Sequence, residues 1–136
     1  MSYNLFLDDL RQVKDVSSWI ELPLVSWAIV RSYKEFTDYI QQNGVPAIVS
    51  FDADLAEEHY GVNWEEADRD GNFEKLNNSL RQKTGYDAAK FLVSYCLDKK
   101  LPLPQYYVHS MNVTAKKHIE MLMERYRPIA EKNRKK

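Results

Sequence analysis

Acidic side chains follow two of the short apolar segments in this sequence. Asp8 and Asp9 come directly after YNLFL, and Asp52 and Asp54 come directly after PAIVSF. Two adjacent carboxylates repel each other unless a cation or solvent takes up their charge. Hard divalent cations such as Mg²⁺ prefer carboxylate oxygens as ligands. If the two segments end side by side, this pattern therefore predicts a metal site.

A third apolar segment, QYYVHSMN, carries other polar side chains that could do chemistry. It contains His109, Ser110 and Asn112, and a helical pattern begins directly after it. Free amides at the start of a helix favour an anion. Each residue taken alone is more often structural, because aspartates commonly cap helices and a lone histidine is commonly hydrogen-bonded in a core. A functional interpretation depends on all three segment ends meeting.

Four short segments have the composition expected of buried strands. They are rich in β-branched and aromatic residues and too short for stable helices. They are residues 3–7, 46–51 and 105–110, with 25–30 as a weaker fourth.

Three helical patterns lie among these segments, and each begins at a residue that can cap free amides. The caps are Ser32 with Glu35, Thr84 with Asp87, and Asn112. We expect the first helix to end at Gly44, the second before Pro102 and the third at Pro128. Strands that alternate with helices predict a parallel sheet, whose carboxyl ends open on one shared edge where ligands bind.

The chain length favours one domain over residues 1–136. Residues 12–24 read as a loop with a short helical turn. Residues 55–83 form a long polar insertion with one expected helix around NFEKLNNSLRQK, and such insertions tend to be lids, binding loops or disordered. Residues 129–136 form a basic tail that we expect to be a solvated end.

Composition excludes several classes of function. Lys and Arg number 19 against 20 Asp and Glu, so no global field favours DNA or an anionic membrane. No long apolar run or secretion signal is present, and we expect a cytoplasmic protein. The single cysteine, Cys96, lies in an apolar helical pattern and reads as a buried structural thiol. No P-loop or glycine-rich dinucleotide motif occurs.

In order along the chain, the motifs LFLDDLR, VRSYKEF, IVSFDADL, TGYDAAKFL and YYVHSMN resemble the cyclic-phosphate processing receiver-like domain family. The resemblance implies an α/β, receiver-like (flavodoxin-like) three-layer fold with a mostly parallel sheet of four to five strands. We expect the usual last strand to be missing, because only a short tail follows the third helix. The resemblance also implies roles for three carboxylates. Asp8 and Asp9 would be the acidic pair and Asp52 the receiver-type aspartate, and together they would bind Mg²⁺. Family members often have a histidine between the third-strand aspartates, where this chain has Ala53.

Our first hypothesis is a metal-dependent phosphoesterase that acts on a cyclic phosphate, either the 2′,3′-cyclic end of RNA or a cyclic nucleotide. Mg²⁺ or Mn²⁺ would be held by carboxylates, and the catalytic residues would be Asp52 and His109, the latter as general acid. Asp52 as a nucleophile is a variant of this mechanism. The metal ligands would be Asp8, Asp9, Asp52 and Asp54, and the phosphate-binding residues Ser110, Asn112, Arg11 and Arg31. Arg31 has an equally good interpretation as an ordinary surface residue at a strand end.

Two alternatives remain open at the level of sequence. The domain could bind metal and a phosphate-bearing ligand without turnover, which the missing strand and the lack of a strong nucleophile motif favour. It could also be a protein-binding domain with vestigial acids, in which YYVHSMN and residues 55–83 form the interface.

Overall fold

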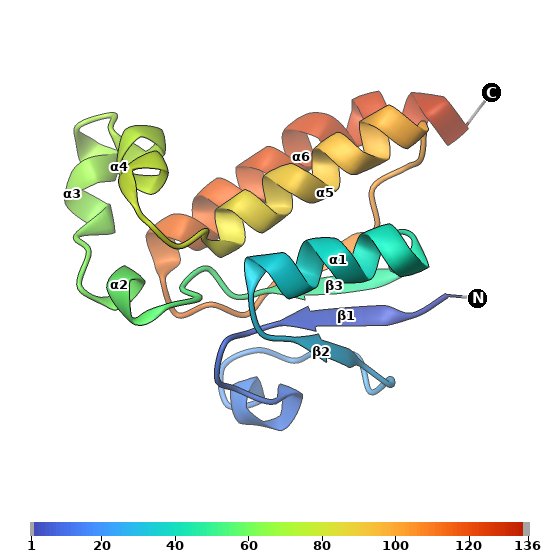
Figure 1. Cartoon of the computed structure of the whole chain (residues 1–136), viewed down its shortest axis with the longest axis horizontal. Helices are drawn as coiled ribbons and strands as arrows, with labels where there is room; N and C mark the ends of the chain where they lie inside the picture. Colours follow the sequence, from blue (N-terminus) through green and yellow to red (C-terminus); the bar gives the residue numbers. More distant parts are fainter. Residues whose placement is uncertain (1, 135–136) are drawn as a thin grey trace.

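The computed structural model describes residues 2–134, and its centre is a sheet of four parallel strands (Figure 1). The strand order is β2-β1-β3-β4, so β1 and β3 are the inner strands. The strands are β1 (Asn4–Leu7), β2 (Ala28–Val30), β3 (Ile48–Phe51) and β4 (Gln105–Val108). All four match the predicted apolar segments, and the receiver-like α/β fold class is confirmed.

In the described part of the chain, seven helical elements connect and flank the strands. They are the 3₁₀ turn η1 (Val13–Val16) and the helices α1 (Tyr33–Asn43), α2 (Glu57–Tyr60), α3 (Trp64–Arg69), α4 (Phe73–Ser79), α5 (Gly85–Lys99) and α6 (Val113–Arg134). The predicted caps form: Ser32 accepts from the amide of Glu35, and Thr84 and Asp87 make a reciprocal capping box. None of the helices within residues 2–134 has the length and hydropathy that crossing a bilayer requires.

The two faces of the sheet are covered differently. One face carries the main core, the buried cluster formed by β1, β3 and the helices α1, α5 and α6. Leu5 and Leu7 of β1 are fully buried in it, and the three helices lie on the same side of the sheet in Figure 1. On the other face Phe6 packs with Val16 and Leu22 from the segment between β1 and β2. This alternation is the period of two expected for a strand buried on both sides. Within residues 2–134, the second face is thus covered by a thin layer from the segment between β1 and β2, in which η1 is the helical element.

The insertion at residues 55–83 contains three short helices, α2, α3 and α4, where the sequence predicted one. Trp64 and Phe73 anchor it, because both rings are buried in the main core with centroids 5.3 Å apart. Asp68 of α3 also pairs with Lys117 and His118 of α6. The insertion is therefore a packed wall of the domain.

The prediction that Pro128 ends the last helix was wrong. Helix α6 continues through Pro128 to Arg134, so most of the predicted basic tail belongs to it, while residues 135–136 lie outside the described residues. A proline inside a helix removes one hydrogen bond and costs about 3 kcal/mol. Ala130, beyond the proline, is fully buried in the main core, and this packing keeps the chain helical.

Candidate functional site

The predicted convergence of the strand ends is present at the carboxyl edge of the sheet. The ladder of hydrogen bonds continues one step past each strand: the amide of Asp8 donates to Val30 (3.1 Å), that of Asp52 to Leu7 (2.9 Å) and that of His109 to Phe51 (3.0 Å). Pairing in register places Phe6, Ser50 and Tyr107 on one face. Asp8, Asp52 and His109 each follow one of these residues by two positions, so the period of two brings them together. One ligand atom from each lies within 4.8 Å of the others.

Asp8 is fully buried and its carboxylate is held in one orientation. Its Oδ1 accepts hydrogen bonds from the amides of Leu10 (2.9 Å) and Arg11 (2.8 Å), and its Oδ2 lies 3.0 Å from Nε2 of His109. Burial favours the neutral acid, but the hydrogen bonds from His109 and the two amides outweigh it and lower the pKa of Asp8. Asp8 is therefore ionised, and its Oδ2 is turned toward His109.

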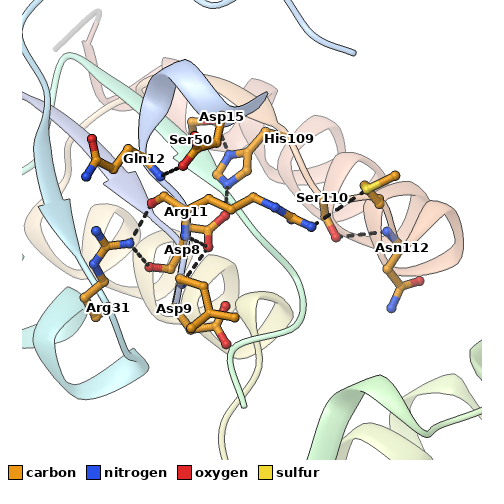
Figure 2. A network of polar contacts seen from close by, with 12 residues as sticks. Asp8, Asp9, Arg11, Gln12, Asp15, Arg31, Ser50, His109, Ser110 and Asn112 are labelled. Carbon is orange, nitrogen blue, oxygen red and sulfur yellow. Dashed lines mark hydrogen bonds and ion pairs between the residues drawn. The ribbon is translucent and has the colours of Figure 1, made fainter. Parts of the chain in front are cut away.

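His109 is fully buried, and both ring nitrogens have partners (Figure 2). Since Asp8 is ionised, Nε2–H donates to it, and Nδ1 accepts from the hydroxyl of Ser50 at 2.7 Å. The ring also stacks on Phe6, with centroids 4.3 Å apart and planes 6° from parallel. Burial lowers the pKa of His109 despite the nearby Asp8 carboxylate. The imidazole is therefore neutral and fixed in position.

Asp52 lies where negative charge accumulates. It is 3 % exposed, and burial together with the charges of Asp8, Asp54 and Asp9 raises its pKa to about 8, although a hydrogen bond from Ser110 opposes the rise. A carboxyl group whose ionisation is opposed by its neighbours gains when a cation arrives. This is the electrostatic signature expected of a cation site.

Asp9 and Asp54 lie on the border of the buried cluster. The hydroxyl of Tyr60 donates to both carboxylate oxygens of Asp9, at 3.2 and 3.1 Å, and Asp9 points away from the Asp8 and His109 pair in Figure 2. Asp54 accepts a hydrogen bond from Nδ2 of Asn112 at 3.2 Å. Burial raises the pKa of both carboxyl groups. Their predicted role as metal ligands stays a prediction.

Ser110 and Asn112 lie at the start of α6. The hydroxyl of Ser110 accepts from the amide of Asn112 at 3.1 Å, and Oδ1 of Asn112 caps the helix by accepting from the amide of Ala115 at 3.0 Å. Both residues line the same cavity as Asp52 and Asp54. Their geometry therefore suits the predicted contact with an anion, which stays a prediction.

The two predicted arginines occupy different positions. Arg11 lines the cavity. Nη1 of Arg31 instead donates to two main-chain carbonyls, those of Asp8 (3.1 Å) and Arg11 (2.6 Å), as Figure 2 shows. Direct phosphate binding by Arg31 stays a prediction, whereas its observed contacts fix the turn that follows β1.

A cavity of about 570 Å³ opens beside the acidic cluster. Asp52, Asp54 and Arg11 line it from the sheet edge, and residues of the α2 to α3 segment and of the start of α6 form its walls. The buried His59 fixes the first wall, because its Nδ1 accepts from the amide of Leu55 and its Nε2 donates to the carbonyl of Gln82, each at 2.9 Å. The two ends of the insertion are thus joined directly.

The residues of the cluster fit a divalent cation. Oδ2 of Asp8 has one lone pair left after the hydrogen bond from His109, and Asp52 is a crowded carboxyl group at the edge of the cavity. Oxygen donors of this kind suit Mg²⁺ or Mn²⁺ better than a soft metal. The identity of the ion stays a prediction.

Two residues that build the site were not found from the sequence. Ser50 is a fully buried hydroxyl inside a strand, and its interruption of the apolar segment PAIVSF was the available signal. Trp19, in the weakly patterned loop after β1, donates its Nε1–H to the carbonyl of His109 at 2.8 Å. No local pattern indicates that contact, because it joins residues 90 positions apart.

The fold and the site together define a receiver-like α/β domain with an acidic cluster at the carboxyl edge of its sheet. Comparison with protein families shows that the chain belongs to the cyclic-phosphate processing receiver domain family, which matches residues 3–125. No curated protein and no solved structure matched the chain significantly.

Proposed function

We propose that this domain is a metal-dependent phosphoesterase that opens a cyclic phosphate, either the 2′,3′-cyclic end of an RNA or a cyclic nucleotide. The observation that carries the proposal is the meeting of Asp8, Asp52 and His109 within 4.8 Å beside a cavity that Arg11 and Ser110 also line. The name of the matched family refers to the processing of cyclic phosphates. A cavity lined by both carboxylates and an arginine also suits a phosphate that is bound to a metal ion.

Asp8 and Asp52 would hold Mg²⁺ or Mn²⁺, with Asp9 and Asp54 as further carboxylates. When bound, the metal polarises the phosphoryl oxygens and lowers the pKa of water. Arg11 pairs with the phosphoryl charge, Ser110 donates to a phosphoryl oxygen, and the side chain of Asn112 orients Asp54.

The test is hydrolysis of a nucleoside 2′,3′-cyclic phosphate and of an RNA with a 2′,3′-cyclic end, with Mg²⁺ or Mn²⁺. We expect Asp52→Asn to lower turnover by at least about a hundredfold, because the variant loses a charged group at the reacting centre. The matched control is Asp98→Asn, since Asp98 is an exposed residue of α5 outside the cavity lining. Equal rates for Asp52→Asn and the wild type would remove Asp52 from the mechanism.

For His109 we propose a positioning role as an alternative to the predicted general acid. The ring is fully buried, both nitrogens have partners, and it does not line the cavity. Its neutral Nε2–H donates to Asp8 and keeps Oδ2 in place, an arrangement that commonly orients ligands around a metal.

The variant His109→Gln separates the two roles, because a glutamine amide can still donate to Asp8 but cannot transfer a proton at neutral pH. If His109 positions Asp8, His109→Gln keeps Mn²⁺ affinity and turnover within about tenfold, while His109→Leu loses both. Titration with Mn²⁺ followed by electron paramagnetic resonance measures the affinity. A glutamine variant that binds Mn²⁺ normally but loses the pH-dependent turnover would support the general acid.

The burial of His109 also favours a second candidate, a module that binds metal and a phosphate-bearing ligand without turnover. Of the described residues that line the cavity, one is a histidine, His59. Both of its ring nitrogens already form hydrogen bonds to the main chain of the insertion, so neither is available for proton transfer to a ligand. Calorimetry with Mg²⁺ and a nucleoside 2′,3′-cyclic phosphate, run beside the hydrolysis assay, distinguishes the candidates. Binding without product would support the module.

A further inference from the structure

The side chain of Arg11 lies next to acidic residues but pairs with none of them. Burial raises the pKa of Asp9 and of Asp54, and the positive charge of Arg11 opposes this rise in both. Nevertheless, among residues 2–134, no carboxylate forms a salt bridge with its guanidinium group. Its hydrogen bond goes to the sulfur of Met111 at 3.8 Å, which is a weak acceptor. Most of its donors therefore remain available to a ligand in the cavity.

The main chain of Arg11 is tied down on both sides. Its amide donates to Oδ1 of Asp8 at 2.8 Å, and its carbonyl accepts from Nη1 of Arg31 at 2.6 Å. Figure 2 shows these contacts at the end of β1, with the Arg11 side chain extended from there toward Ser110. A long side chain on a fixed backbone still has several rotatable bonds, and ordering them on binding costs affinity.

Trp19 supplies the missing restraint on the side chain. The guanidinium carbon of Arg11 lies over its indole ring, 5.2 Å from the ring centroid. The indole Nε1–H donates to the carbonyl of His109 at 2.8 Å, which fixes the ring against the end of β4. Trp19 is 40 % exposed and belongs to neither buried core cluster of the described residues, so one side of the residue remains open to solvent. An arginine stacked on an aromatic ring keeps its edge donors free for an anion.

We propose that Trp19 is a positioning residue that holds the guanidinium of Arg11 over the cavity as a preorganised partner for the phosphate of the bound ligand. This inference rests on the proposed function, since it assumes a phosphate beside the carboxylate cluster. It assigns Arg31 a supporting role through the carbonyl of Arg11.

The test measures binding of inorganic phosphate to the Mg²⁺-loaded protein by calorimetry. We expect Trp19→Leu to weaken phosphate binding about three- to tenfold without changing Mg²⁺ affinity, because it removes the aromatic face beneath Arg11 and a hydrogen bond to the main chain of His109 but no carboxylate of the cluster. Trp19→Phe keeps an aromatic face and recovers part of the affinity. In an Arg11→Gln background, itself weaker by at least about tenfold, Trp19→Leu has no further effect.

The control is Trp27→Phe. The Trp27 indole also donates to a main-chain carbonyl, that of Pro23, but its ring packs against Phe6 on the face of the sheet that η1 covers and, within residues 2–134, carries no arginine. It leaves phosphate affinity unchanged. The proposal is overturned if Trp19→Leu leaves phosphate affinity unchanged, or weakens it equally with and without Arg11.

A second readout needs no ligand and separates this inference from the proposed function. In nuclear magnetic resonance spectra of the free protein, we expect ring currents of Trp19 to shift the Arg11 side-chain protons nearest the guanidinium group, and we expect Trp19→Leu to abolish the shift. If the shift is present but no phosphate binds, the proposed function fails while the stacking stands as a structural contact only. If the shift is absent, the inference fails whatever the ligand.

Discussion

Replacing Gly85 with alanine is expected to destabilise the protein by about 3 kcal/mol or more and to weaken metal binding. A Cβ atom at this position would lie 1.8 Å from the carbonyl oxygen of Asp52 and 2.8 Å from the Cα of Ala53. Both obstacles are main-chain atoms, so no side-chain rotation can relieve the overlap. The first turn of α5 or the end of β3 has to move, which costs more than ordinary overpacking of 1–3 kcal/mol. Urea unfolding and Mn²⁺ titration measure the two effects.

The sign of this effect runs against helix propensity. Alanine at the first helical position normally favours the helix over glycine by up to about 1 kcal/mol. Here the amide of Gly85 donates to the carbonyl of Ala53 at 2.9 Å, so the start of α5 rests on the backbone that carries Asp52. Gly61→Ala is the matched control, because its added Cβ would meet nothing within 4 Å. If Gly85→Ala unfolds at the same urea concentration as Gly61→Ala, the close approach does not constrain the site.

The sequence was sufficient to place the acidic side chains at one edge of the sheet. The inference needed only that Asp8 and Asp52 follow buried segments and that parallel strands end together. Pairing in register then decided which neighbours meet: His109 lies between Asp8 and Ser50 because it follows Tyr107 by two residues. The register of strand pairing is not visible in one sequence. His109 could therefore be identified as a candidate site residue, but its contacts with Asp8 and Ser50 could not be predicted.

The elements that sequence analysis missed are those that tertiary packing decides. Pro128 is a helix breaker by local rules, yet the burial of Ala130 carries α6 beyond it. The insertion is polar and lacks long apolar periodicity, but Trp64 and Phe73 reach the main core and order three short helices. Local propensity is a weak prior where a few large side chains supply most of the buried surface.

The metal-free protein is expected to lose stability between about pH 4 and pH 8, with Asp52 as a main cause. In the unfolded chain this carboxyl group loses its proton near pH 4. In the folded protein its pKa is raised to about 8 by burial and by the charges of Asp8, Asp54 and Asp9. The folded state therefore binds one more proton than the unfolded state across this window, and the free energy of unfolding falls as the pH rises.

Asp52→Asn removes that titration while keeping the shape of the side chain. At pH 8 without metal, we expect this variant to be more stable than the wild type by at least about 1.4 kcal/mol, the value of one pKa unit, and the difference to vanish near pH 4. Added Mg²⁺ should reverse the order at pH 8, because a cation replaces the proton in the wild type and stabilises it in proportion to its binding. Urea unfolding at both pH values, with Asp98→Asn as the control for an exposed acid, measures the effect. A wild type that is as stable as Asp52→Asn at pH 8 without metal, and that gains nothing from Mg²⁺, would mean that the clustered charges are relieved by other means and that the cluster is not a cation site.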